Sequence, residues 1–208
     1  MIAIVDYGVG NLFSLASSVK SLGLEVTITR NAADLRAADH ILLPGVGAFA
    51  DAMDKLTATG LVPVLKEETR HTPLLGICLG MQLLFDKSYE FGEHEGLGLI
   101  SGQVCPLAPE LKNPALKVPH IGWNALDISR PEDPLFRYVQ NGEYVYYVHS
   151  FYARDCAAST LATSEYSIPV TGAVRQGLVY GTQFHPEKSG EAGLKMLRRF
   201  AEWRADAC

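Results

Sequence analysis

The stretch LLGICLGMQLLF, residues 74–85, decides the fold. Its first residues are apolar and predict a buried strand, and the apolar residues from Leu79 to Phe85 predict a helix. Cys78 stands at the junction, between Gly76 and Gly80. A nucleophile on a tight strand-to-helix turn has strained backbone geometry, and its neighbours two positions away must be nearly free of side chain. The spacing therefore predicts a nucleophile elbow.

Cys78 is accordingly a candidate nucleophile. A sulfur at the start of a helix lies near free N–H groups and the positive end of the helix dipole, which favour the thiolate form. The alternative is a buried structural cysteine between two core elements, the commoner role of a lone cysteine in an apolar run. The paired glycines favour the nucleophile without excluding the structural role.

The composition limits the number of domains and the classes of partner. The chain has 208 residues, 48% hydrophobic content and a net charge of -5, with a mean hydropathy of +0.08. We expect one domain spanning residues 1–208 with one sizeable core. No run of Lys or Arg provides a basic stripe, so we expect no nucleic-acid partner. No stretch approaches the ~20 apolar residues of a membrane span, so we expect none.

The cysteines and glycine-rich turns exclude further classes. The four cysteines are widely spaced and lack C-x-x-C pairing, which predicts a reducing, cytoplasmic location without disulfides and no metal site; they are Cys78, Cys105, Cys156 and Cys208. The turn Gly8-Val9-Gly10 resembles part of a dinucleotide fingerprint, but Phe13 stands where the third glycine belongs. We therefore expect no cofactor.

The order of predicted elements indicates the fold class. The first half alternates strands and helices as a parallel α/β sheet does; strands are expected at 2–5, 24–29, 40–43 and 74–77, and helices at 12–22, 50–56 and 61–69. Strands dominate the second half, where we expect antiparallel additions to the core; they are predicted at 97–100, 103–107, 144–148, 159–163, 170–176 and 178–184. An amphipathic helix at 189–203 ends the chain.

A cysteine nucleophile needs a base and a group that orients the base, and His185 and Glu187 fit these roles. Pro186 between them favours extended geometry at His185, where residues two apart point the same way. Glu187 would fix the tautomer of the imidazole. The other histidines lack such a neighbour and are expected to be structural or exposed; they are His40, His71, His94, His120 and His149.

An elbow enzyme also needs an oxyanion hole, with one N–H from the residue after the nucleophile and one from a loop after another strand. Leu79 supplies the first. The segment 44–47, Pro-Gly-Val-Gly, follows a predicted strand and could aim the second, from Val46. The alternative is a simple strand-ending turn.

Two motifs together resemble the class I, triad-type glutamine amidotransferases: GICLGMQ at 76–82 and QFHPEKS at 183–189. Within that family the whole chain most resembles the glutaminase subunits of imidazole glycerol phosphate synthases. The closer resemblance rests on four stretches: DYGVGN at 6–11, PGVGAF at 44–49, HIGWN at 120–124 and YVHSFY at 147–152.

The resemblance implies a flavodoxin-like, mostly parallel sheet with helices on both faces. It implies hydrolysis of L-glutamine to glutamate and ammonia through a Cys78 thioester, with His185 as acid and base and Glu187 orienting it. Ammonia would pass to a (β/α)₈-barrel cyclase partner that makes imidazole glycerol phosphate and AICAR in histidine biosynthesis.

The resemblance also implies roles for further residues. Those expected to hold glutamine are Gly47, Gln82 and the backbone of Ser150 and Phe151. The Val46 peptide is expected to rotate into the oxyanion hole when the partner binds. Those expected at or near the partner are Asn11, Trp123, Tyr138 and Lys188.

Two alternatives stay open at this point. A cysteine hydrolase or peptidase of similar build would use the same triad without needing Gln82 or a partner. A catalytically silent binding module would keep the fold while Cys78 and His185 lay apart.

Overall fold

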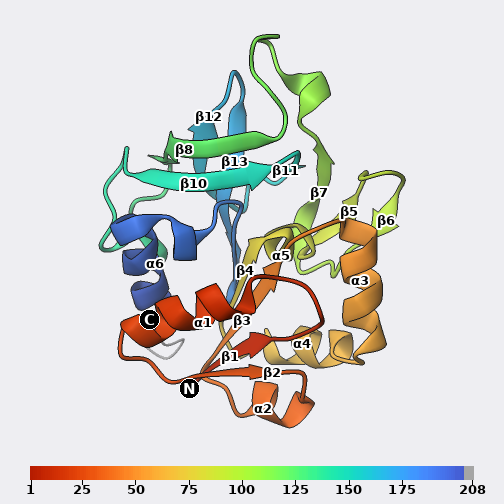
Figure 1. The fold of residues 1–208 in the computed structure, drawn as a ribbon, viewed down its shortest axis with the longest axis vertical. Helices are drawn as coiled ribbons and strands as arrows, with labels where there is room; N and C mark the ends of the chain where they lie inside the picture. The colour runs from red at the N-terminus through yellow and green to blue at the C-terminus, as the bar shows by residue number, and fades with distance from the viewer. Residues whose placement is uncertain (204–208) are drawn as a thin grey trace.

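The computed structural model describes residues 1–203, and a mixed eight-stranded sheet lies at its centre (Figure 1). The strand order is β2-β1-β3-β4-β14-β13-β12-β9. Five neighbouring strands are parallel: β2 (Val26–Thr29), β1 (Ile2–Val5), β3 (His40–Gly45), β4 (Leu74–Cys78) and β14 (Val179–Thr182). The rest are antiparallel: β13 (Pro169–Gln176), β12 (Thr160–Glu165) and β9 (Asp127–Ile128). Cys208 lies outside the described residues.

Helices cover both faces of the parallel strands, as the sequence predicts. They are α1 (Leu12–Ser21), α2 (Ala32–Arg36), α3 (Phe49–Ala58), α4 (Val62–Glu68), α5 (Leu79–Gln82) and α6 (Gly190–Glu202). Alternate residues of a strand point to opposite faces. In β1, Ile2 and Ile4 pack in one cluster with α1 and α6, whereas Ala3 and Val5 pack in another with α2, α3 and α4. The mostly parallel fold class is therefore confirmed.

The second half departs from the prediction. The segments 103–107 and 144–148 do not join the main sheet. The first lies in β7 (Ile100–Pro106), part of a sheet ordered β11-β7-β5-β6 with β11 (Phe151–Arg154), β5 (Phe85–Ser88) and β6 (His94–Glu95). The second forms β10 (Tyr144–His149), which pairs with β8 (His120–Ala125) in a separate two-stranded sheet. Segment 178–184 is also not antiparallel to its inner neighbour, because β14 runs parallel to β4.

The elbow helix is shorter than predicted, because α5 ends at Gln82. The carbonyl oxygens of Leu83, Leu84 and Phe85 accept hydrogen bonds from backbone N–H groups of residues 97–100. Those bonds replace helical ones and turn the chain into β5. Residues 97–99 form no strand, and β7 begins at Ile100. Three short 3₁₀ segments complete the chain: Ala108–Glu110, Pro134–Phe136 and Pro186–Lys188.

Candidate active site

Cys78 lies at the end of β4 with the backbone geometry predicted for an elbow. Its φ is 56° and its ψ is -112°, a strained conformation for a residue with a side chain. A Cβ added at Gly76 would lie 2.6 Å from the carbonyl oxygen of Gly80, and one added at Gly80 would lie 1.8 Å from that of Leu43. Both flanking positions therefore require glycine, for the steric reason the sequence suggested.

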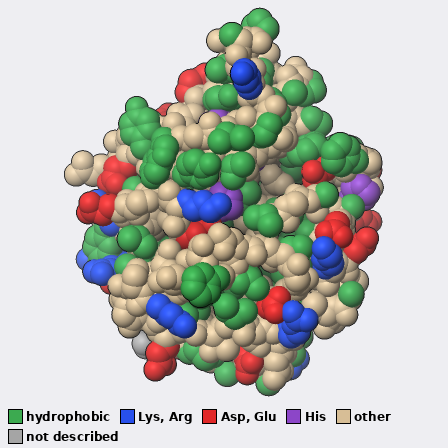
Figure 2. Space-filling model, in the orientation of Figure 1, with side chains coloured by type: hydrophobic (Ala, Val, Ile, Leu, Met, Phe, Trp, Pro, Cys, Tyr) green, Lys and Arg blue, Asp and Glu red, His purple; other side chains and the backbone are tan. Residues whose placement is uncertain are grey.

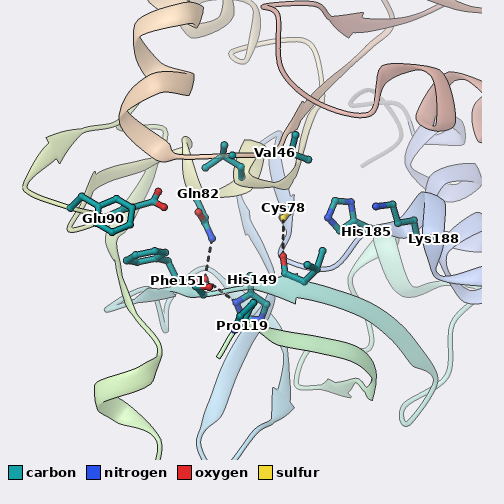
Figure 3. A pocket seen from close by; sticks show the side chains of 14 residues that line it. Val46, Cys78, Gln82, Glu90, Pro119, His149, Phe151, His185 and Lys188 are labelled. Atoms are coloured by element: carbon teal, nitrogen blue, oxygen red, sulfur yellow. Dashed lines mark hydrogen bonds between the residues drawn. The ribbon is translucent and has the colours of Figure 1, made fainter. Parts of the chain in front are cut away.

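His185 and Glu187 follow β14, the strand beside β4, so the ends of two adjacent parallel strands bring the base to the nucleophile. His185 Nδ1 and Glu187 Oε1 are 2.8 Å apart, and both side chains are 4% exposed. Figure 3 shows the imidazole beside the Cys78 sulfur. The thiol donates to the Val148 carbonyl at 3.9 Å, while His185 Nε2 is buried without a hydrogen bond. Nε2 can therefore receive the thiol proton.

The charge state of His185 suits this role. Burial lowers the pKa of His185, but the neighbouring Cys78 and Glu187 side chains outweigh burial and raise the pKa to about 9. The site thus stabilises the imidazolium form beside the sulfur. This is the form that donates a proton to a leaving amine.

A cavity of about 550 Å³ opens over Cys78 and is lined by most of the residues predicted from the sequence. These are Val46, Gly47, Cys78, Leu79, Gln82, Ser150, Phe151, His185 and Lys188. Glu187 does not line the cavity and reaches it only through His185. Residues that the sequence reasoning missed also line it: Glu90, Phe91, Pro119, Val148 and His149. Figure 3 shows Glu90 and Lys188 at opposite ends, with Cys78 between them.

The strand β3 runs on through Pro44 and Gly45, two residues further than predicted, and Val46 follows it at the cavity with 43% of its surface exposed. Gly47 has a φ of 99°, which favours glycine. The buried Tyr7 hydroxyl donates to the Pro44 carbonyl at 2.7 Å, and burial together with the nearby Cys78 raises the pKa of Tyr7 well above its usual range. Tyr7 therefore stays a donor and fixes the base of the loop, while Val46 beyond it is exposed.

The predicted glutamine contacts need one refinement. The Phe151 carbonyl accepts from Gln82 Nε2 at 3.0 Å and from His149 Nδ1 at 2.9 Å. A carbonyl oxygen has two lone pairs, so both are occupied. The Ser150 carbonyl accepts from the Leu107 N–H. The acceptors that remain for a ligand here are Gln82 Oε1 and the second lone pair of the Ser150 carbonyl.

Glu90 is a buried carboxylate in the cavity wall. Its Oε2 accepts from the Phe49 N–H at 2.6 Å, at the start of α3, where Ala48 offers no side-chain cap. Burial raises the pKa of Glu90, and the Phe49 hydrogen bond and His94 oppose that effect. No local pattern marks Glu90 in the sequence, since its place depends on a contact across 41 residues.

The predicted partner residues divide into two groups. Lys188 lines the cavity, and Trp123 on β8 is 55% exposed and packs edge-to-face on Tyr146. Asn11 instead caps α1 by accepting from the Ser14 N–H, and Tyr138 donates to Glu202 near the end of α6. The structure does not bring Asn11 or Tyr138 to the cavity.

Residues 1–203 contain three of the four cysteines. Cys78, Cys105 and Cys156 are free and buried. No group of three or more His, Cys, Asp or Glu side chains is placed to hold a metal ion in this part of the chain, and none of its helices is long and apolar enough to cross a membrane.

Known proteins resemble the chain over nearly its full length. A protein named imidazole glycerol phosphate synthase subunit HisH, from Syntrophotalea carbinolica, is 46% identical over 206 residues, which cover 97% of this chain and 100% of that protein. Proteins of the same name from Listeria monocytogenes and Bacillus cytotoxicus are each 48% identical, covering 97% and 96% of this chain and 95% and 93% of their own lengths.

Solved structures share the fold. A crystal structure described as a glutamine amidotransferase superposes with a TM-score of 0.74 at 18% identity, covering 98% of this chain and 100% of its own. The structure of PurLQS from Thermotoga maritima gives 0.72 at 19% identity, covering 97% of each chain. The family model for class-I glutamine amidotransferases matches residues 3–203. The chain therefore belongs to the class-I glutamine amidotransferase family.

Proposed function

We propose that this chain is the glutaminase subunit of an imidazole glycerol phosphate synthase. The observation that carries the proposal is Cys78 on a strained elbow beside the His185–Glu187 pair, at the floor of a cavity with a carboxylate at one end. The name of the relatives that match almost the whole chain supports the synthase assignment.

The first half of the reaction forms a thioester. His185 Nε2 takes the thiol proton, and the Cys78 sulfur attacks the side-chain carboxamide carbon of glutamine. The carbonyl π electrons move to oxygen, where the N–H groups of Leu79 and Val46 stabilise the charge. When the C=O bond re-forms, the C–N bond breaks, and His185 returns its proton to the departing nitrogen as ammonia.

The second half regenerates the enzyme. A water molecule gives a proton to His185 as its oxygen attacks the thioester carbon. The C–S bond then breaks, glutamate leaves, and the sulfur recovers the proton from His185. Glu187 holds the imidazole through Nδ1 in both halves of the reaction.

The cavity suits an amino acid bound by its head at the end away from His185. The Glu90 carboxylate and Gln82 Oε1 are acceptors for an α-ammonium group, and Figure 3 places both on the same side of Cys78. The glutamine side chain would then reach from that end to the sulfur. Gly47 and the Ser150–Phe151 backbone complete the wall.

Ammonia is useful only to a docked partner, because free ammonia in neutral water is mostly ammonium. The partner is therefore proposed to be a separate synthase subunit, a (β/α)₈ barrel. We further propose that its binding rotates the Val46 peptide into the oxyanion hole. One missing oxyanion donor costs about 10²–10³-fold in turnover, so the isolated chain should be a slow glutaminase.

The test is to trap the thioester. Labelled glutamine is mixed with the chain and the candidate barrel subunit, the mixture is acid-quenched, and the peptide containing Cys78 is examined by mass spectrometry. A glutamyl thioester on Cys78 is expected, with the ammonia released equal to the free glutamate plus the trapped thioester. A protein that cleaves peptide amides and forms no adduct from glutamine would be a peptidase, and the proposal would be wrong.

A further inference from the structure

Gln183 is fully buried beside the nucleophile, and neither the triad nor the glutamine pocket gives it a role. Its Nε2 donates to Cys78 Sγ at 3.8 Å. Its Oε1 accepts from Gln82 Nε2 at 3.0 Å, and its backbone N–H is bonded to the Gly172 carbonyl. Both polar atoms of the Gln183 side-chain amide are therefore hydrogen-bonded, and its NH₂ group is the one bonded to the Cys78 sulfur.

Donor and acceptor chemistry fixes which end of the amide faces the sulfur. The Phe151 carbonyl can only accept, so Gln82 must present its NH₂ group there. The second hydrogen of the same nitrogen points to Gln183, whose Oε1 must therefore be the acceptor. The Gln183 NH₂ group is then left facing Cys78. Rotating either amide by 180° would place two oxygens or two NH₂ groups against each other.

The same logic extends to a pair of buried histidines. Burial lowers the pKa of His149 to about 3 and that of His120 to about 4, so both are neutral near pH 7. A neutral imidazole has one donor and one acceptor nitrogen. His149 Nδ1 faces the Phe151 carbonyl and must carry the proton, so its Nε2 accepts from His120 Nδ1 at 3.0 Å. His120 lies on β8, the strand that carries Trp123.

We infer that Gln183 is a further catalytic residue, whose side-chain amide donates to the Cys78 sulfur and stabilises it as the thiolate. His149 and His120 are positioning residues that fix this amide through the Phe151 carbonyl and Gln82. The inference rests on the proposed function, because it assigns a role in the same thioester chemistry.

The contacts of the sulfur explain why the donor matters. The thiol proton is directed at the Val148 carbonyl. Once His185 removes that proton, the Val148 oxygen faces a negative sulfur and no longer contributes a favourable contact. The Gln183 N–H then becomes a hydrogen bond to an anion, which is about twice as strong as one to a neutral group. No bond is made or broken at Gln183 itself.

Alkylation of Cys78 by iodoacetamide tests the donor without using glutamine. In the full chain, Gln183→Met keeps the length and removes the donor, and we expect alkylation at pH 7 to be about 10-fold slower. The difference should close as the pH rises, because the thiolate then forms without help. A packing defect would not be repaired by pH. Gln140→Met, at an exposed position, is the matched control and should alkylate at the wild-type rate. Equal rates and equal pH profiles for Gln183→Met and wild type would overturn the inference.

A measurement on the wild-type chain covers the case in which Gln183→Met does not fold. The side-chain NH₂ resonances of Gln183 are followed by NMR, assigned through their contacts with Gln82. They should move when Cys78 ionises and again when it is alkylated. Resonances that stay fixed through both changes would show that the amide does not bond to the sulfur.

The positioning role has its own readout. His149→Asn keeps a donor near the Nδ1 position and should retain most of the alkylation rate, whereas His149→Leu should lose about threefold or more. In the Gln183→Met background, His149→Leu should cause no further loss, since the amide it positions is gone. Additive losses would remove the histidines from the inference. If no form of the chain turned over glutamine while these alkylation effects held, the proposed function alone would fail.

Discussion

At the residue scale, we expect glutamine hydrolysis to depend on three neighbouring side chains, those of Cys78, His185 and Glu187. We expect Cys78→Ser and His185→Ala each to lower glutamine hydrolysis by about 10⁴-fold or more, because each removes a group that handles the bond being broken. Glu187→Ala should leave about 10–10² times more activity than these two, since the role proposed for Glu187 is only to orient the base. The assay is ammonia release with the partner present.

Ammonia-dependent synthesis by the partner is the control for that set. All three changes spare the acceptor site, so synthesis from added ammonium salt should continue. Normal glutamine hydrolysis by Cys78→Ser would contradict the mechanism.

The raised pKa of His185 gives a pH dependence of stability. The folded-state value of about 9 lies above the ordinary 6.5, so the imidazolium contributes stability that is complete below about pH 6.5 and is lost as the pH rises through about 9. The free energy of unfolding should therefore fall across this window, by at most about 1.4 kcal/mol per pH unit. Urea unfolding of wild type and His185→Gln at pH 6.5, 7.5 and 9 measures it. Parallel curves for the two proteins would contradict the pKa direction.

How far the sequence predicts the site depends on how local the pattern is. Gly76, Cys78 and Gly80 act within five residues of chain, and His185 and Glu187 are two apart, so their geometry follows from local sterics. Glu90 escapes this reasoning because it bonds to the Phe49 N–H at the start of α3, 41 residues away. His149 escapes it because its position depends on the pairing of β10 with β8 and on His120, 29 residues away.

At the scale of elements, α5 packs against β3 so closely at Gly80 that a Cβ there would overlap the β3 backbone. Gly80→Ala would place a Cβ 1.8 Å from the Leu43 carbonyl oxygen, so the strand and helix must separate. We expect a loss of about 3 kcal/mol or more in the free energy of unfolding, measured by urea titration. Gly60→Ala is the matched control, with a φ of 71° and no atom within 4 Å of the added Cβ. It should lose only the left-handed backbone cost of about 1–2 kcal/mol. Equal losses would show that the close contact is not limiting.

The pairing of β8 with β10 should make the fold sensitive to acid. His120 and His149 have folded-state pKa values depressed to about 4 and about 3. The stability they confer as neutral groups is present above about pH 6.5 and is lost as the pH falls toward 4, since the unfolded chain binds the protons first. His120→Phe keeps the stacking on Tyr166 and Tyr147 but removes one titrating group. Its stability should fall less steeply between pH 6.5 and 4 in thermal unfolding, and an unchanged slope would contradict the assignment.

Strand order in the second half could not be read from the sequence. Alternating apolar residues marked most of its strands, but they do not say which edge a strand joins. The determinant is a tertiary contact. The carbonyl groups of residues 83–85 accept hydrogen bonds from the N–H groups of residues 97–100, so the chain enters a second sheet instead of lengthening the elbow helix.

At the scale of the whole molecule, the face around the cavity is suited to docking. In Figure 2 a histidine lies beside a basic side chain near the centre of the face shown, with hydrophobic side chains above them and an acidic side chain below. Val46, Trp123 and Ile121 are exposed. We expect Trp123→Ala to weaken partner binding by about 2 kcal/mol, as for a buried aromatic anchor, in calorimetric titration. Ile28→Ala on the edge strand β2 is the control and should bind normally. Unchanged binding by Trp123→Ala would move the interface elsewhere.

Tyr138 and Asn11 can be tested against the same partner. Both lie away from the cavity, so their predicted place in the interface stays a prediction, as do the single-domain organisation and the cytoplasmic location.

The strand order also bears on when the enzyme becomes active during its own synthesis. Cys78 follows β4 and His185 follows β14, and these neighbours in the sheet are about a hundred residues apart in the chain. A ribosome must therefore extrude the chain through β14 before that strand can pair with β4. Pairings of such sequence separation form slowly, because a long loop must close first. We therefore expect nascent chains that have not yet reached β14 to carry Cys78 without His185 beside it and to leave glutamine unhydrolysed.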